Sequence, residues 1–160
     1  MKIGITGSLS SGKSSVAKIL SNNNKLLFSA DIAVQNLYKS RSFQKKISKK
    51  FRLKKKEIKQ EIKEKLLSKK ISLKSLGKLV HPIVRLKMRN FYKKNKNKNI
   101  LFFEIPLLIE SKLMNYFDFI ILVVAPRKQR LKRYISKGGD KKMFDLLDKG
   151  QISPKKKMKF

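Results

Sequence analysis

The stretch GSLSSGKSS, residues 7–15, follows a short β-branched apolar run at the start of the chain. Two of the seven glycines in 160 residues, Gly7 and Gly12, lie five positions apart in it, and Lys13 and Ser14 come directly after the second. The stretch matches G-x-x-x-x-G-K-[ST], a phosphate-binding pattern that requires a strand before it and a helix after it. The residues on either side predict that context.

The spacing in this motif has a physical explanation. Gly7 and Gly12 let the backbone turn tightly enough for successive N–H groups to face a phosphate, and a helix N-terminus adds partial positive charge. Lys13 reaches the outer phosphates and Ser14 can ligate magnesium. We therefore expect a nucleoside-triphosphate site, and the motif by itself leaves kinases, GTPases, ATPases and motor proteins open. The expected nucleotide contacts come from Ser8, Leu9, Ser10, Ser11, Gly12, Lys13, Ser14 and Ser15.

Strand-like and helix-like segments alternate along the rest of the chain. Runs of apolar and β-branched residues predict strands at 2–6, 25–29, 100–104 and 119–125. The last of these is expected to be an interior strand. Helical spacing predicts helices at 13–20, 30–38, 79–92 and 126–137. Between 41 and 78 lies a lysine-rich helical insertion, and Pro82 is compatible with a first helical turn. The alternation predicts an α/β fold, a parallel sheet covered by helices on both faces.

The composition is strongly basic. Lys and Arg total 42 against 10 Asp and Glu, a formal net charge of +32, and only seven of the basic residues are arginines. The partner must be an anion, whether nucleic acid, an acidic membrane face or a phosphorylated small molecule. We favour a solvated lysine surface over a dedicated nucleic-acid face, and a genome rich in A and T would produce the same bias.

The cysteine content and the apolar segments narrow the possible classes of protein. The chain has no cysteine, which excludes a disulfide, a thiolate metal site and a catalytic thiol. The apolar start is too short for a signal peptide, and FIILVVA, residues 119–125, is too short to span a bilayer. We expect a cytoplasmic protein.

A carboxylate is needed near the phosphates if a hydroxyl is to be phosphorylated. Asp31 follows the second predicted strand, where such a base would lie. An N-cap of the following helix is the alternative role for this residue.

Several further segments resemble one family. IGITGSLSSGKSSVA, ADIAV, LVHPIV, PLLIE and APRKQRLKR occur in the order and at the spacings of dephospho-coenzyme A kinases, over nearly the whole chain. The resemblance implies ATP- and Mg²⁺-dependent phosphorylation of the ribose 3′-hydroxyl of dephospho-coenzyme A, the last step of coenzyme A synthesis. It also implies one P-loop nucleoside-triphosphate hydrolase-like domain over 1–160, with a substrate-binding helical insertion at about 39–92 and a lid at about 127–150.

Residue roles follow from the same resemblance, position by position. Asp31 matches the general base, Lys13 and Ser14 the phosphate and magnesium contacts, and Gln129 and Arg133 the lid helix, so that Asp31, Lys13 and Arg133 are the expected catalytic residues. Glu104 stands where an acidic residue could hold magnesium through water, with a surface glutamate as the alternative. The expected substrate side consists of Asp31, His81, Pro106, Leu107 and Glu110. A structural histidine and plain core at 106–109 are the alternatives there.

The sequence also departs from the family pattern. Ser29 stands where the family has the first carboxylate of its Asp-Ala-Asp motif. Lys137 stands where a second lid arginine is usual, and Leu147 where the family has an arginine four residues before the glutamine that is Gln151 here. The sequence stops at Phe160, before the family's last strand and adenine loop, which predicts an exposed sheet edge and either a fragment or a reduced enzyme.

Two rival functions stay open. One is another small-metabolite or nucleotide kinase of the same fold. The other is an RNA-associated protein that has lost catalysis. With the kinase favoured, the expected partner is dephospho-coenzyme A, with no specific nucleic acid and no membrane, and the protein is expected to be a monomer.

Overall fold

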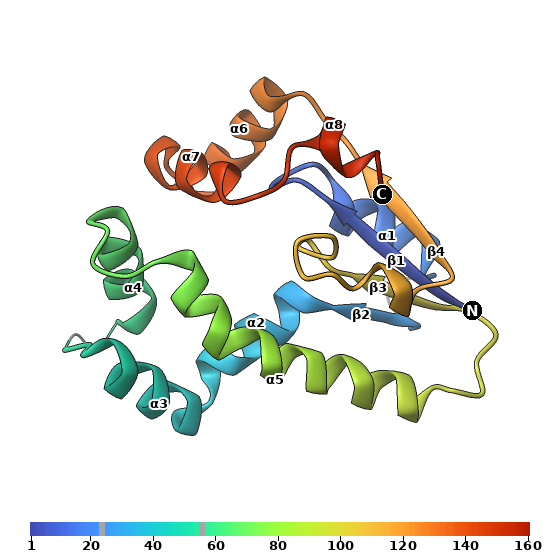
Figure 1. Ribbon diagram of the computed structural model, residues 1–160, viewed down its shortest axis with the longest axis horizontal. Helices are drawn as coiled ribbons and strands as arrows, with labels where there is room; N and C mark the ends of the chain where they lie inside the picture. The colour runs from blue at the N-terminus through green and yellow to red at the C-terminus, as the bar shows by residue number, and fades with distance from the viewer. Residues whose placement is uncertain (23–24, 55–56) are drawn as a thin grey trace. The chain divides into compact units, whose positions relative to one another are not determined.

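A parallel sheet of four strands organises the computed structural model, which describes residues 1–22, 25–54 and 57–160. The strand order is β2-β3-β1-β4 (Figure 1). The strands are β1 (Lys2–Gly7), β2 (Leu27–Ser29), β3 (Leu101–Glu104) and β4 (Phe119–Val123). The predicted parallel α/β architecture is confirmed.

Successive residues of β3 point to opposite faces of the sheet, and each face is covered. Phe102 packs with Ile5 and with Ala17 of α1 (Lys13–Leu20) in one buried cluster. Phe103, which is fully buried, lies 5.6 Å between ring centroids from Phe91 of α5 (Leu73–Lys94). The predicted helical cover on both faces is therefore present.

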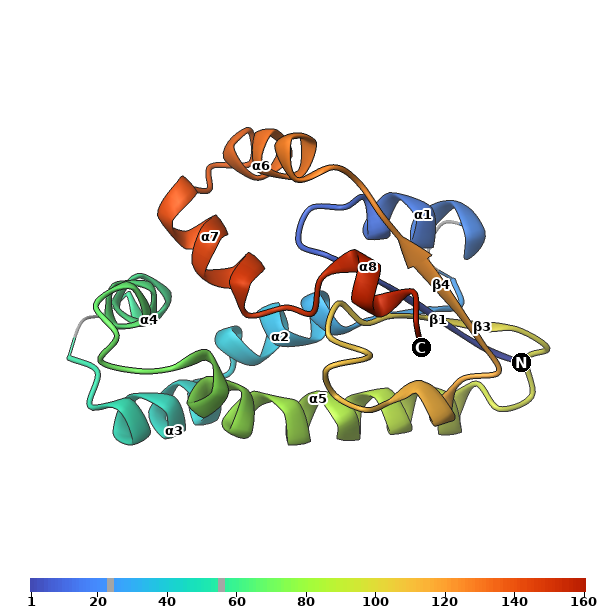
Figure 2. The ribbon, with the colours of Figure 1, turned by 45° about the horizontal axis from the view of Figure 1, so that its top comes forward.

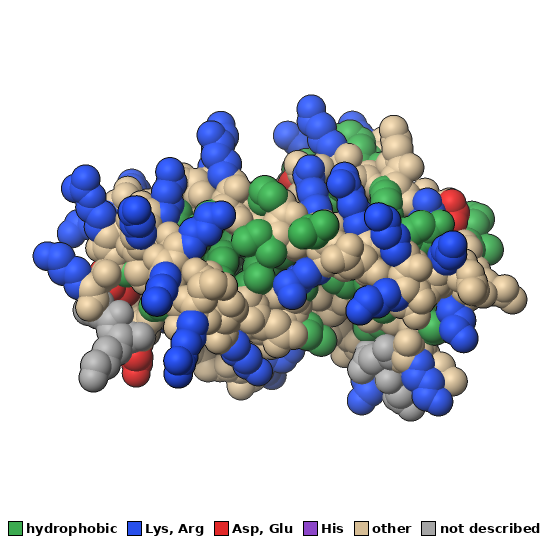
Figure 3. Space-filling model, turned by 90° about the horizontal axis from the view of Figure 1, so that it is seen from below, with side chains coloured by type: hydrophobic (Ala, Val, Ile, Leu, Met, Phe, Trp, Pro, Cys, Tyr) green, Lys and Arg blue, Asp and Glu red, His purple; other side chains and the backbone are tan. Residues whose placement is uncertain are grey.

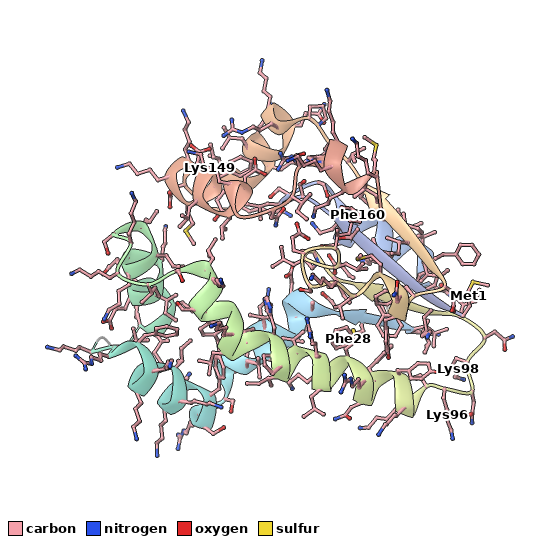
Figure 4. All side chains as sticks on the ribbon, in the orientation of Figure 1. Met1, Phe28, Lys96, Lys98, Lys149 and Phe160 are labelled. Atoms are coloured by element: carbon pink, nitrogen blue, oxygen red, sulfur yellow. The ribbon has the colours of Figure 1, made fainter. Side chains whose placement is uncertain are left out.

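Aromatic rings fill the second face. The ring of Phe28, labelled on β2 in Figure 4, lies 5.9 Å from Phe91 and 6.2 Å from Phe103. Phe117 lies 5.4 Å from Phe103 in a tilted arrangement. Offset and edge-to-face rings add about 0.5–1.5 kcal/mol per pair beyond burial. This cluster holds β2 and β3 in the register that pairs Ser29 with Glu104.

The chain divides into two compact units. The first comprises Met1–Asp31 and Asn90–Phe160 and holds the whole sheet; the second comprises Ile32–Arg89 and is helical. Besides most of α2 (Ala30–Lys39) and α5, the second unit contains α3 (Arg41–Phe51) and α4 (Ile58–Leu67). Its buried apolar side chains include Phe43, Ile47, Ile62 and Leu66. The lysine-rich insertion is thus helical where it is described, and positions 55–56 within it lie outside the described residues.

Two expectations from the sequence are wrong in detail. The segment 119–125 was expected to form an interior strand, but β4 is one of the two outermost of the described strands and Phe119 is 61% exposed. An apolar run is compatible with either position, because β4 still packs Ile121 and Val123 onto the core. The helix expected from 79 begins at Leu73, so Pro82 lies inside α5 and not in its first turn.

Three helices follow β4 in the first unit. They are α6 (Arg127–Ile135), α7 (Lys141–Lys149) and α8 (Pro154–Lys157), and a 3-10 turn, η1 (Met114–Tyr116), precedes β4. Asp140 caps α7 by accepting a 2.8 Å hydrogen bond from the Met143 amide. Figures 1 and 2 both show the segment from α7 to α8 running back toward the strands. None of the helices in the described ranges is long and apolar enough to cross a membrane.

Candidate active site

The phosphate loop joins β1 to α1 and depends on glycine at two places. Gly7 has φ 151°, and a Cβ there would lie 2.2 Å from the carbonyl oxygen of Val123 on β4. Gly12 has φ 105° and precedes α1 without any side-chain cap. Ser10 takes φ 57°, a left-handed value that costs energy for a residue with a Cβ and is found preferentially at functional sites. The loop therefore has a tight, left-handed backbone conformation at Gly7, Ser10 and Gly12, directly before the N-terminus of α1, where an anion can bind.

Lys13 is the buried cation of this loop. The residue is 6% exposed, and its Nζ donates a 2.8 Å hydrogen bond to the carbonyl oxygen of Ser8. Burial lowers the pKa of Lys13, the charges of Asp31 and Glu104 raise it, and those of Lys157 and Arg130 lower it further. Lys13 thus lies in the same electrostatic environment as two carboxylates.

Glu104 ends β3 and accepts two serine hydroxyls. Ser14 Oγ donates to its Oε1 at 2.5 Å, and Ser29 Oγ donates to its Oε2 at 2.9 Å. The residue is only 3% exposed, so the alternative of a surface glutamate is wrong. Its carboxylate connects the first turn of α1 with the ends of β2 and β3.

Asp31 is the second residue of α2, so it is not the N-cap of that helix. Desolvation by the surrounding site raises the pKa of the Asp31 carboxyl, the charge of Glu104 raises it further, and Lys13 lowers it. The residue nevertheless keeps an exposed side, which a base needs to receive a proton from a substrate.

Two arginines of α6 reach the phosphate loop. Arg133 Nη1 donates to the carbonyl oxygen of Ser11 at 3.1 Å. Arg130 donates from Nη1 to the carbonyl oxygen of Leu9 at 3.3 Å and forms a forked pair with Asp148 of α7, with Nη1–Oδ1 at 2.6 Å and Nη2–Oδ2 at 3.3 Å. Sequence reasoning missed Arg130, although its position one turn before Arg133 places both on one side of the helix.

A second group of residues, to which the sequence analysis gave no role, lies in Gln151–Lys157, which we call the 151–157 strap. The Gln151 side chain accepts the Leu9 amide of the phosphate loop at 3.0 Å. The next amide, that of Ile152, donates to Glu110 Oε1 at 2.9 Å. Lys157, whose side chain is fully buried, pairs with the same oxygen at 2.9 Å and donates to the carbonyl of Pro106 at 3.3 Å.

The strap therefore joins the nucleotide loop to the segment 106–110. Thr6, the next-to-last residue of β1, also donates a hydrogen bond from its Oγ1 to the carbonyl oxygen of Pro106 at 3.1 Å. Within this segment Leu108 and Ile109 are core, as the alternative for 106–109 expected, while Pro106 and Leu107 are half-buried. No signal in the sequence distinguished Lys157 from its many lysine neighbours.

The sequence-predicted residues fall into two groups. Lys13, Ser14, Asp31 and Glu104 share one site, with Arg133 at its loop, and Glu110 is joined to that loop through the strap. His81 belongs to the helical second unit, on α5.

A glycine-dependent phosphate loop at the end of a central parallel strand, with a buried lysine and arginines from a following helix, defines a P-loop kinase. The chain belongs to the dephospho-CoA kinase family, whose family model matches residues 1–160. The dephospho-CoA kinase of Rickettsia typhi is 31% identical over 159 residues, covering 99% of this chain and 83% of that protein. The dephospho-CoA kinase of Bartonella henselae is 33% identical over 161 residues, covering 97% of this chain and 83% of its own length.

A solved structure shares the fold. The crystal structure of TT1252 from Thermus thermophilus superposes with a TM-score of 0.74 at 26% identity, covering 99% of this chain and 84% of that one. These similarities support the expected transferase class, with kinase activity and ATP binding.

The buried pair Lys157–Glu110 generates a test of the strap. Lys157→Met keeps the length of the side chain but leaves the Glu110 carboxylate without its cation, so the free energy of unfolding should fall by about 3 kcal/mol. Lys156→Met, at an exposed neighbour, should change it by less than about 0.5 kcal/mol. Urea unfolding of both variants measures the difference, and equal stabilities would show that the pair does not hold the strap.

Proposed function

We propose that this kinase transfers the γ-phosphoryl group of ATP to the ribose 3′-hydroxyl of dephospho-coenzyme A. The observation that carries the proposal is the shared environment of Lys13, Asp31 and Glu104 beside the phosphate loop. Membership of the family and the names of its relatives support the choice of substrate.

Asp31 would act as the general base. As the 3′-oxygen forms its bond to the γ-phosphorus, the bond from that phosphorus to the β–γ bridging oxygen breaks, and the hydroxyl proton passes to the Asp31 carboxylate. The products are coenzyme A and ADP. The raised pKa of Asp31 makes it a stronger base than an ordinary aspartate, and its exposed side gives a hydroxyl access to it.

Lys13 and Arg133 would stabilise charge on the phosphates. Both donate hydrogen bonds to carbonyl oxygens of the loop, those of Ser8 and Ser11, which supports a role beside a phosphate bound at the loop. The Ser11 hydroxyl is buried and has no hydrogen-bond partner among the described residues, as suits a donor to a phosphate oxygen. Pre-positioned donors of this kind supply most of the catalysis in phosphoryl transfer.

The donor set near the loop fits Mg²⁺. The Ser14 hydroxyl and the Glu104 carboxylate offer hard oxygen atoms 2.5 Å apart. The part of the chain that the structure describes contains no cluster of three or more acidic, His or Cys ligands, and Mg²⁺ bound with ATP needs only one or two protein oxygens beside phosphates and waters. We propose that Ser14 would hold the ion directly and that Glu104 would hold it through water. When bound, the ion would neutralise charge on the β- and γ-phosphates.

The remaining expectations are part of the proposal. His81, Pro106, Leu107 and Glu110 would contribute to the substrate side, the region at about 39–92 would bind substrate and that at about 127–150 would act as the lid. The Glu110 Oε2 atom is buried and has no hydrogen-bond partner among the described residues, which supports a polar contact there. A cytoplasmic monomer without a nucleic-acid or membrane partner would suffice for this reaction.

Turnover measurements test the substrate assignment. With ATP and Mg²⁺, dephospho-coenzyme A should be converted to coenzyme A, and nucleoside monophosphates should not be phosphorylated. Lys13→Ala should lower kcat at least about a hundredfold, because the cation stabilises the transferring phosphoryl group. Turnover of a nucleoside monophosphate with none of dephospho-coenzyme A would contradict the proposal.

Asp31→Asn separates the base from a structural role. The change keeps the size of the side chain but removes its ability to accept a proton, so kcat should fall by about 10²-fold or more while ATP affinity and thermal stability stay near those of the parent. In the parent, activity requires ionised Asp31, so it should be lost on acidification with a midpoint above 3.8. Parent-like turnover by Asp31→Asn would exclude Asp31 as the base.

A further inference from the structure

Leu9 lies in the phosphate loop, and both of its main-chain polar groups are held by side chains that are distant in the sequence. Its amide donates a 3.0 Å hydrogen bond to Oε1 of Gln151 in the strap, 142 residues away. Its carbonyl oxygen accepts a 3.3 Å hydrogen bond from Nη1 of Arg130 on α6, 121 residues away. These two contacts act on the two consecutive peptide groups that meet at Leu9.

The amide of Leu9 and the carbonyl of Ser8 belong to one peptide group. A trans peptide is planar, and its N–H and carbonyl groups point to opposite sides. Because the N–H points to Gln151, the carbonyl oxygen points away from the strap. There it accepts the 2.8 Å hydrogen bond from Nζ of Lys13. Gln151 therefore sets the orientation of the peptide group that Lys13 contacts.

The carbonyl of Leu9 and the amide of Ser10 belong to the next peptide group. Since the carbonyl oxygen points to Arg130, the N–H of Ser10 points away from that guanidinium. Ser10 has the left-handed φ of 57°, which is costly for a residue with a Cβ and persists only where the surrounding contacts maintain it. Arg130 thus holds the loop directly before its left-handed residue.

Arg130 differs from the solvated cations of this protein. Figure 3 shows Lys and Arg side chains spread across the face in view, whereas Arg130 is only 4% exposed. Its Nε donates to the carbonyl oxygen of Ala125, after β4, at 3.2 Å, and its Nη atoms form the forked pair with Asp148 of α7. The planar guanidinium is therefore fixed from two sides in addition to its contact with the loop.

Gln151 is anchored as well. Its amide donates to the carbonyl oxygen of Asp148 at 3.1 Å, where α7 ends. The next amide, that of Ile152, is held by the carboxylate of Glu110. Gln151 and Arg130 thus both rest on Asp148, the first through its main chain and the second through its side chain.

We propose that Arg130 and Gln151 are positioning residues for phosphate binding. Together they hold Leu9 and so keep the phosphate loop in the conformation that receives the phosphates of ATP, and neither side chain needs to touch a phosphate. A loop that is ordered before the ligand arrives loses less entropy on binding. The inference deepens the proposed function because it concerns the same loop. It is tested by ATP binding alone, so its failure and that of the substrate assignment are separate results.

Calorimetric titration of the full chain with ATP and Mg²⁺, without a phosphate acceptor, tests the proposal. Gln151→Met keeps the length of the side chain but loses the acceptor oxygen, so the Kd for ATP should rise at least about fivefold. Arg130→Lys keeps the charge but loses the planar fork, and the Kd should rise at least about threefold. Ser153→Ala removes a hydrogen bond elsewhere in the strap and should change the Kd less than about twofold.

Circular dichroism at the titration temperature separates positioning from a loss of folding. The apparent Kd of a partly unfolded protein rises in inverse proportion to its folded fraction. Unfolding alone would therefore raise the Kd fivefold only if about four-fifths of the molecules were unfolded, which the spectrum would reveal. We expect both variants to keep the spectrum of the parent.

Nitrogen-15 NMR of the ligand-free chain reports on Leu9 directly. In Gln151→Met the Leu9 amide loses its hydrogen bond and should exchange with solvent at least about tenfold faster. Gln151→Glu restores an acceptor oxygen and should restore the slow exchange. Arg127→Met removes the other arginine that pairs with Asp148 and should leave the exchange of Leu9 unchanged.

Two results would overturn the proposal. One is a Kd for ATP in Gln151→Met and Arg130→Lys equal to that of the parent. The other is an equal rise of the Kd in Gln151→Met and Ser153→Ala, which would reflect a general disturbance of the strap. A raised Kd in folded variants, together with faster exchange at Leu9 in Gln151→Met, is the result that the proposal requires.

Discussion

The buried carboxylate of Glu104 is the constraint around which the nucleotide site is arranged. An ionised carboxyl that is 3% exposed is costly unless its oxygens are hydrogen-bonded, and the hydroxyls of Ser14 and Ser29 each satisfy one of them. These two bonds fix the first turn of α1 and the end of β2 against the end of β3. Lys13, buried next to the same carboxylate, supplies the opposite charge.

Ser29 illustrates how a departure from the family pattern is accommodated. The resemblance predicts a carboxylate at this position, which would place a third negative charge beside Glu104 and Asp31. A serine instead donates a hydrogen bond to Glu104, so the site keeps one buried carboxylate and one partly exposed one. Their mutual repulsion contributes to the raised pKa of Asp31, and the two acidic groups can thus serve different tasks.

Most of the fold could be predicted, because the glycine-lysine-serine spacing and the alternation of strands and helices are local signals. The position of β4 in the sheet could not be predicted. Ile121 and Val123 pack against the core, so the sequence of this outer strand is as apolar as that of an inner strand. The extent of α5 was also missed, because Pro82 marks a helix start more often than a helix interior.

The site divides in the same way. Lys13, Ser14 and Asp31 could be predicted because the sequence next to each of them carries the signal. Arg130, Gln151 and Lys157 could not, because they hydrogen-bond to loop or segment residues that are far away in the sequence. In a chain with 42 basic residues, composition cannot distinguish a buried lysine such as Lys157 from its solvated neighbours. Such pairings become visible only when β3, the segment 106–110 and the strap are brought together.

Glu104 and the desolvating walls of the site together make Asp31 a stronger base than an ordinary aspartate. Carbon-13 NMR titration of the Asp31 carboxyl in the parent and in Glu104→Gln, which keeps an acceptor oxygen but loses the charge, measures this directly. We predict that the pKa of Asp31 lies above 3.8 in the parent and is lower in Glu104→Gln but still above 3.8, because desolvation remains. A parent pKa at or below 3.8, or one that Glu104→Gln leaves unchanged, would contradict it.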